Sequence, residues 1–178
     1  MNYRKADPVG IDKVIDRIQS KIHEPLLNKW GSLDMYGRVY KKTDKKGSIS
    51  LQRYVGDGEY DPVLFSEGNK IFFVQGKRVD IEFETNTCDL YIVVILDIQE
   101  IYNTDFRETE RARLDICDEL YKVLDDDSIK GIEYEMSSLR SIVEDSISYG
   151  NFKFSDVHPY HVMMIKTSVE YPANSFEC

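Results

Sequence analysis

The sequence predicts an α+β fold, with helices packed on a mostly antiparallel sheet in a single domain of 178 residues. Three observations lead to this class. Most segments that resemble strands lie in the first 103 residues, while two further helical patterns follow later in the chain. Hydrophobic residues make up 42% of the chain, which is enough for a sizeable core. Neither an internal repeat nor a linker rich in Pro, Gly or Ser divides residues 1–178, so we expect one domain.

The first predicted element is a helix that opens near Asp7. Asp7 is a candidate N-cap residue, and Pro8 suits the first helical turn. We expect Pro25 to interrupt or kink the helix and Gly31 to end it. An apolar stripe at helical spacing marks the buried face: Ile11, Val14, Ile15, Ile18 and Ile22.

A basic hairpin is predicted at residues 35–55. Residues 35–43 favour a strand, residues 44–47 a turn, and residues 48–55 alternate as a second strand. One reading of its lysines is that they only discourage aggregation at a sheet edge. The hairpin carries six basic residues: Arg38, Lys41, Lys42, Lys45, Lys46 and Arg53.

The strongest strand patterns lie between residues 70 and 103. Residues 70–75 (KIFFVQ) and 78–85 (RVDIEFET) are separated by Gly76 and Lys77. In the second segment Val79, Ile81 and Phe83 alternate with charged residues, which predicts one buried and one solvated face. Residues 91–96 are apolar on both faces, as in a central strand, and residues 97–102 are expected to continue it with one exposed face.

Four elements are predicted after residue 103. Asp105 and Glu108 resemble a capping box that opens a helix, and three aspartates at 125–127 end it. A short extended segment is expected at 129–136, a third helix from Ser137 to before Gly150, and a final strand at 161–171. The buried face of the first of these helices is expected to hold Ala112, Ile116, Leu120, Val123 and Leu124.

Charge is unevenly distributed along the chain. The net charge is −9, yet residues 1–53 hold 12 Lys and Arg against 6 Asp and Glu, and the remainder holds 11 against 26. A basic N-terminal third on an acidic body suggests self-association between unlike surfaces, or an anionic partner; the alternative is an uneven solvated surface. The overall acidity argues against a general nucleic-acid binder.

Composition also restricts the cellular setting. No run approaches the ~20 apolar residues that a membrane helix needs, and the first residues contain no apolar core of a secretory signal. Cys88, Cys117 and Cys178 share no metal-ligand spacing and cannot all pair, which favours a reducing, intracellular site of assembly.

Two residue sets were weighed as catalytic or metal sites. Asp156, His158 and His161 offer oxygen and imidazole donors in one short loop, but no second cluster completes a site, and Pro159 favours a structural corner before the last strand. Asp80, Glu82 and Glu84 could supply nuclease carboxylates, although a solvated strand face is simpler. Phosphate-loop and nucleophile-elbow motifs are missing. We therefore expect no catalytic residue, no bound metal and no cofactor.

The order of elements resembles that of tail terminator, tail-completion and head–tail connector (neck) ring proteins of tailed bacteriophages. The points of resemblance are the helix at 11–22, the sheet segments at 70–103, the helix at 106–124 and the final segment SDVHPYHVMMIKTSVEY. They cover nearly the whole chain and consist of pattern and order, with no residue signature.

The resemblance implies a structural virion protein, not an enzyme. It would form a homo-oligomeric ring in the neck or at the head-proximal end of the tail, assembled in the bacterial cytoplasm. Its partners would be other neck, tail or portal-associated proteins, with genome DNA passing through the lumen without sequence-specific binding and no membrane contact. The six basic hairpin residues would contact a neighbouring subunit. The alternatives are a small metal-dependent enzyme such as a nuclease, or an acidic module that binds a basic partner.

Overall fold

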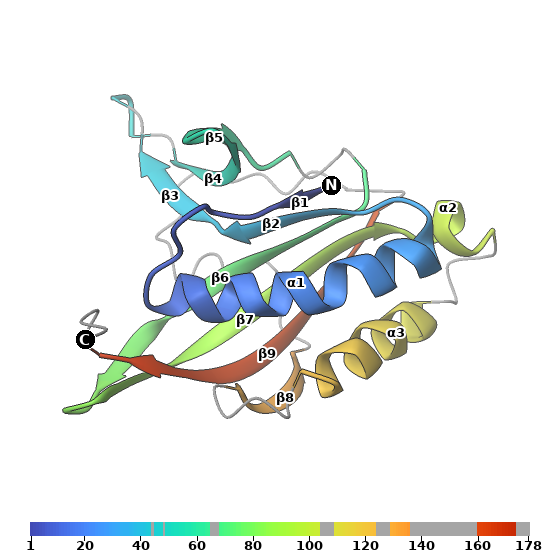
Figure 1. Cartoon of the computed structure of the whole chain (residues 1–178). Helices are drawn as coiled ribbons and strands as arrows, with labels where there is room; N and C mark the ends of the chain where they lie inside the picture. The colour runs from blue at the N-terminus through green and yellow to red at the C-terminus, as the bar shows by residue number, and fades with distance from the viewer. Residues whose placement is uncertain are drawn as a thin grey trace.

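The computed structural model describes residues 1–43, 45–47, 49–64, 68–103, 109–123, 129–135 and 160–173. It confirms the α+β class: helices cover one face of a six-stranded, mostly antiparallel sheet (Figure 1). The strand order is β1-β2-β6-β7-β9-β8. β1 and β2 pair in parallel, as do β2 and β6, and the remaining neighbours are antiparallel. In that order the strands are β1 (Asn2–Tyr3), β2 (Asp34–Arg38), β6 (Lys70–Ile81), β7 (Thr85–Asp97), β9 (Tyr160–Pro172) and β8 (Ile129–Glu135).

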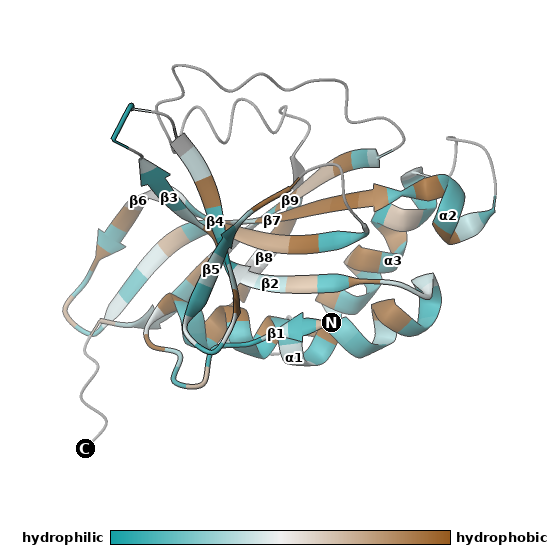
Figure 2. Cartoon of the chain, turned by 90° about the horizontal axis from the view of Figure 1, so that it is seen from above, coloured by the Kyte–Doolittle hydropathy of each residue, from teal (hydrophilic) through white to brown (hydrophobic). Residues whose placement is uncertain are grey.

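A second, three-stranded antiparallel sheet lies on the opposite face of the large sheet from the helices (Figures 1 and 2). Its strands are β3 (Tyr40–Thr43), β4 (Ile49–Gly56) and β5 (Glu59–Pro62). The predicted hairpin at 35–55 is therefore partly wrong, because residues 34–38 belong to the large sheet as β2. Val39 makes the transition: its side chain is buried against the second face, and its N–H donates to Phe73 O at 2.9 Å.

The first helix, α1 (Ile11–Trp30), buries the predicted apolar stripe. The predicted Asp7 cap is wrong: the N-cap is Gly10, whose φ of 55° suits glycine. The predicted interruption at Pro25 is also wrong, because the helix continues to Trp30. Leu26 and Trp30 extend the buried stripe past Pro25, and we attribute the continuity to that packing. Gly31 ends the helix as predicted, donating its N–H to Leu27 O at 2.8 Å.

β6 is one long strand where the sequence predicted two. The register with β7 shifts between Gln75 and Val79, so Gly76 and Lys77 lie in a bulge and do not end the strand. Gly76 is required by a close approach, since a Cβ there would lie 2.9 Å from Asp89 Cβ. The turn follows at residues 82–85, where Glu82 N–H donates to Thr85 O at 2.8 Å.

β7 is the central strand that the sequence predicted, paired with β6 on one side and with β9 on the other. It does not extend beyond Asp97, which corrects the prediction for residues 97–102. These residues form α2 (Ile98–Tyr102), because the Asp97 side chain caps the helix by accepting from Glu100 N–H at 3.1 Å. Figure 2 shows hydrophobic residues concentrated in the central strands, including β7 and β9.

The later elements agree with the sequence where the structure describes them. α3 (Thr109–Tyr121) packs Ala112, Ile116 and Leu120 inward, and β8 and β9 form the predicted extended segments. The capping box at Asp105 and Glu108, the aspartates at 125–127 and the third helix lie outside the described residues. In the described ranges, no helix is both long enough and apolar enough to span a membrane.

The two faces of the large sheet carry separate apolar clusters. The cluster under the helices joins α1 and α3 to alternate residues of β6, β7 and β9, such as Phe73, Ile92 and Ile165. The cluster on the second face includes Phe72, Val93 and Leu51, and so attaches the small sheet. The two clusters thus hold the helices and the small sheet against opposite faces of the large sheet.

Candidate functional site

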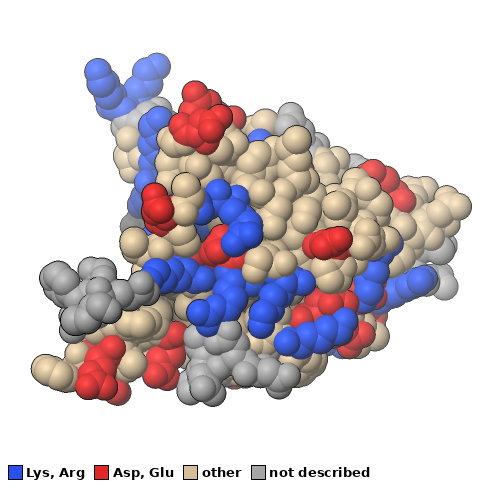
Figure 3. Space-filling model, in the orientation of Figure 1, with Lys and Arg blue, Asp and Glu red and all other residues tan. Residues whose placement is uncertain are grey.

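The β3–β4 hairpin holds five of the six predicted interface residues, and four of these five are exposed lysines. Its strands pair from Tyr40 opposite Gln52 to Thr43 opposite Ile49. Figure 3 shows basic side chains at the end of this hairpin, at the upper left of the molecule. The exposed lysines are Lys41, Lys42, Lys45 and Lys46.

Arg38 and Arg53 instead make contacts within the chain. Arg38 Nε lies 3.0 Å from Asp12 Oδ1, and its guanidinium also donates to Gln75 Oε1. Arg53 stacks over the ring of Tyr36, 4.5 Å from its centroid. Both arginines therefore support the base of the hairpin, and the four lysines form its exposed basic surface.

Asp12 is the centre of a partly buried ionic cluster at the base of the hairpin. Its side chain is nearly inaccessible, and its Oδ2 accepts from Lys5 Nζ at 2.7 Å and from Tyr40 Oη at 3.2 Å. Burial alone would lower the pKa of Lys5, but hydrogen bonds to Asp12 and Tyr40 outweigh it, so that this pKa is raised. The pKa of Arg38 is raised as well, because the charge of Asp12 offsets the burial of the guanidinium. The cluster joins the first turn of α1 to β2 and β3.

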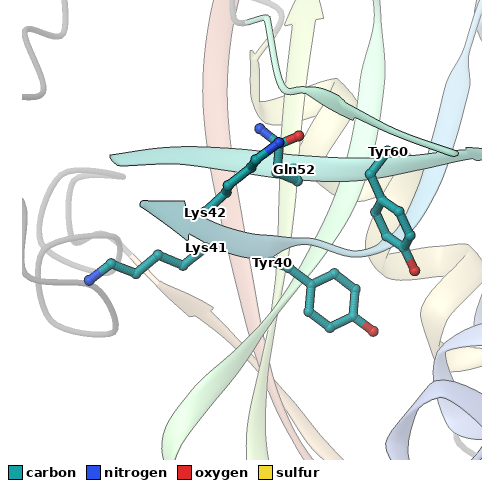
Figure 4. A pocket seen from close by; sticks show the side chains of 5 residues that line it. All are labelled: Tyr40, Lys41, Lys42, Gln52 and Tyr60. Atoms are coloured by element: carbon teal, nitrogen blue, oxygen red, sulfur yellow. The ribbon is translucent and has the colours of Figure 1, made fainter. Parts of the chain in front are cut away.

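A hollow of about 310 Å³ lies beside the lysines, on the outer face of the small sheet (Figure 4). It is lined by Tyr40, Lys41, Lys42, Gln52 and Tyr60. The rings of Tyr40 and Tyr60 meet edge to face with centroids 5.8 Å apart. Tyr60 also contacts Tyr54, at a centroid distance of 5.5 Å. The hollow therefore combines two tyrosine rings with the basic side chain of Lys42, while the Lys41 side chain extends away from the rings (Figure 4). Such a surface suits an apolar group flanked by negative charge.

A second projection is the β6–β7 tip, which we define as residues 80–84. Val79 is partly buried, but Ile81 and Phe83 are 77% and 91% exposed, so the predicted burial of these two side chains is wrong. The strands continue past the layer of helices, and among the described residues no second layer covers the alternating pattern there (Figure 1). The adjacent carboxylates of Asp80, Glu82 and Glu84 are exposed as well.

The sequence alone did not lead us to consider Phe83 as a candidate binding residue. A signal was present: the aromatic residue stands between Glu82 and Glu84. An apolar residue that lies between two carboxylates at a turn is expected to be exposed, because turns lie at the surface and charged neighbours remain in solvent.

The residues weighed as metal ligands do not gather in the described part of the chain. Among those residues, no group of three or more His, Cys, Asp or Glu side chains is placed to hold a metal ion. His161 stands opposite Leu96 near the start of β9, with a partly buried side chain. Asp156 and His158 lie outside the described residues.

The two described cysteines are free and buried. Burial raises the pKa of the Cys88 thiol to about 11, and burial also raises that of Cys117. Neither environment favours the thiolate that nucleophilic catalysis needs.

A further hollow of about 220 Å³ lies over β7, β9 and β8. Lys166 and Asp89 form an ion pair there at 3.3 Å, and Glu133 and Ser168 also line it. Its charges are thus partly compensated within the chain.

Comparison with protein-family models, with curated proteins and with solved structures finds no match to this chain.

Proposed function

We propose that this chain is a structural ring subunit of the neck, or of the head-proximal end of the tail, of a tailed bacteriophage. In this role it joins head and tail around the DNA channel. One observation carries the proposal: a single domain extends two hairpins of opposite charge, the basic β3–β4 hairpin and the acidic β6–β7 tip (Figure 3).

Opposite charge on two separate surfaces of one chain favours head-to-tail assembly. Two basic hairpins repel each other, and so do two acidic tips, whereas a hairpin and a tip attract. A head-to-tail contact repeats from copy to copy, and it forms a ring when the rotation between copies closes. The chain carries its complementary surfaces on projections, as a ring subunit requires.

The overall acidity suits a subunit that surrounds DNA without binding it tightly. With a net charge of −9, a lumen lined by the acidic part of the chain repels phosphates and lets the genome move. The order of elements, which resembles that of tail terminator and neck proteins, supports the same role. The partners are then other copies of this chain and the adjoining neck, tail or portal-associated proteins.

The competing function is that of a metal-dependent enzyme such as a nuclease. The carboxylates of Asp80, Glu82 and Glu84 are exposed on a projecting tip, where little protein surrounds a substrate. Replacing His158 and His161 together with Gln is expected to leave assembly within a few-fold of the original. A stoichiometric metal ion that disappears with this double replacement would favour the enzyme instead.

Electron microscopy of the virion tests the proposal directly. We expect this chain as a closed ring of several copies at the head–tail junction. Native mass measurement of the purified chain at rising concentration complements the images. A single copy per particle, or no copy at all, would contradict the proposal.

A further inference from the structure

We propose that the β6–β7 tip of one copy binds in the Tyr40–Tyr60 hollow of a second copy. Phe83 is the anchor that enters the hollow, and Glu82 and Glu84 pair with Lys41 and Lys42 at its rim. This inference rests on the proposed function, because it names the contact that joins neighbouring subunits.

Phe83 is an aromatic side chain held out in solvent by ordered backbone. The tip is closed by the hydrogen bond from Glu82 N–H to Thr85 O, at 2.8 Å. The last residues of β9 support the other strand, with Asn86 paired to Tyr171, and Ala173 N–H donates to Glu84 O at 3.0 Å. A side chain presented in this way loses little conformational freedom on binding, which reduces the entropic cost of association.

The hollow is formed before anything enters it. Tyr40 is held by its hydrogen bonds to Asp12 and Lys5, and Tyr60 by its ring contacts with Tyr40 and Tyr54. A volume of about 310 Å³ admits one aromatic side chain, and the tyrosine edges and faces offer the offset and edge-to-face contacts that such a ring prefers. Figure 4 shows the two rings beside each other and the Lys41 side chain extending away from them.

The opposite charges of the β6–β7 tip and the β3–β4 hairpin favour contact between these two surfaces. The tip carries the carboxylates of Asp80, Glu82 and Glu84 beside Phe83, and the hairpin carries four exposed lysines, of which Lys41 and Lys42 line the hollow. Both surfaces therefore place charged side chains near aromatic ones, with carboxylates on the tip and lysines on the hairpin. A tip-to-tip or hairpin-to-hairpin contact would bring like charges together, so the complementary contact is between unlike surfaces.

The contact has to be made between copies. Within one chain the tip lies at the lower left of the molecule and the basic hairpin at the upper left, on different projections (Figures 1 and 3). Each copy then offers one tip and one hollow. Such an arrangement allows every subunit to bind two neighbours.

Disulfide trapping tests the contact even when association is weak. One variant carries Phe83→Cys and the other, extended by a mass tag, carries Lys42→Cys; both carry Cys178→Ser. On mixing under mild oxidation we expect the mixed cross-link to form about ten-fold faster than either homodimeric one, and more slowly at high salt. Equal rates for the three pairs, or no cross-link at all, would overturn the proposal.

Substitutions provide an independent readout through the dissociation constant of self-association. We expect Phe83→Ala to raise it about ten-fold, as loss of a central aromatic anchor does. The matched control Val9→Ala removes another exposed apolar side chain and should leave it unchanged. Lys41→Glu with Lys42→Glu should abolish association, and mixing this variant with Glu82→Lys, Glu84→Lys should restore a contact. An unaltered constant in Phe83→Ala would refute the anchor.

These outcomes separate the contact from the proposed function. If Phe83→Ala leaves the rings in the particle unaffected, the proposed function stands and the proposed contact is wrong. If the mixed cross-link forms but the particle contains no ring of this chain, the proposed contact stands and the proposed function is wrong. A short DNA duplex is the competing occupant of the hollow. If the duplex protects Lys42→Cys from labelling and binds the Phe83→Ala variant equally well, while no mixed cross-link forms, the hollow binds an anionic polymer. The proposed contact is then wrong.

Discussion

At the scale of single residues, Asp12 determines whether the basic hairpin has a fixed base. Its carboxylate is nearly inaccessible and is shared by Lys5 and Arg38, with Tyr40 donating a third contact. Removing a buried ion's partner leaves the remaining charges without compensation, which is more costly than the net contribution of the intact pair. The cluster therefore positions the hairpin through Arg38 and Tyr40, and it adjoins the hollow through Tyr40.

We expect Asp12→Ala to lower the free energy of unfolding by about 3 kcal/mol, the amount typical of a broken buried ion pair. Asp16→Ala is the matched control on the same helix. Its partner, Arg4, is 46% exposed, so solvent screens the pair and this change should lower the free energy by no more than about 1 kcal/mol. Urea titration of both variants gives the comparison, and equal losses would contradict a special role for Asp12.

The buried thiols provide a prediction about pH. In a Cys178→Ser background, Cys88 and Cys117 should not react with a thiol reagent at pH 8 until the chain unfolds, because burial suppresses access and thiolate formation. The pKa of Cys88 rises from 9.0 to about 11 on folding, and an acid of raised pKa disfavours its charged form in the folded state. The free energy of unfolding should therefore fall as the pH rises through this interval. Rapid labelling of the native chain would contradict this assignment.

At the scale of elements, the two hairpins are extensions of sheets whose other ends are buried. β4 places Leu51 in the second apolar cluster while its turn projects, and β6 places Phe73 under the helices while its far end projects. The exposed ends can then carry charged and apolar residues that a buried strand could not. For this reason we expect changes at the hairpin ends to affect association and not folding.

Replacing Lys41, Lys42, Lys45 and Lys46 with Ser tests the basic hairpin. We expect self-association to weaken about ten-fold or more while the thermal midpoint stays within a few degrees, because the four side chains are exposed. A control variant replaces Lys13, Arg17 and Lys21 on the exposed side of α1 and loses similar charge elsewhere. If both variants associate like the original chain, the lysines serve solubility alone.

At the scale of the whole molecule, charged side chains gather in patches of either sign. Figure 3 shows basic side chains over α1 and at the β3–β4 hairpin, and acidic ones at the β6–β7 tip and at the top of the molecule beside the basic hairpin. The formal net charge of −9 opposes association of two copies on average, while the local complementarity favours it. The result should be weak association that depends on orientation and on ionic strength.

We expect the dissociation constant of self-association to rise about ten-fold between about 0.05 M and about 0.5 M salt, because screening shortens the range of the attraction between unlike surfaces. Sedimentation equilibrium at the two ionic strengths measures it. Association that strengthens with salt would indicate a contact dominated by apolar burial, and would count against charge as the determinant.

The sequence by itself determined the elements whose pattern agrees with their environment. The stripe from Ile11 to Ile22, the doubly apolar run at 91–96 and the final strand were all predicted, because periodicity reports which faces are buried. The α+β class followed from the order of these elements. Of the candidate interface, the sequence supplied the composition of the hairpin and its excess of lysines.

Only the tertiary structure decided where each pattern lies relative to the layers. Helical packing carried α1 through Pro25, and a side-chain cap turned residues 98–102 into a helix; both are outcomes that local propensity alone ranks lower. Arg38 and Lys41 look alike in the sequence, yet Arg38 meets Asp12, which is 26 residues away, while Lys41 stays exposed. Phe83 alternates like a buried strand residue, and it is exposed because none of the elements that the structure describes extends over the β6–β7 tip. Burial depends on which distant segments pack against a strand. Alternation along the strand distinguishes its two faces, but it does not show whether another element covers either face.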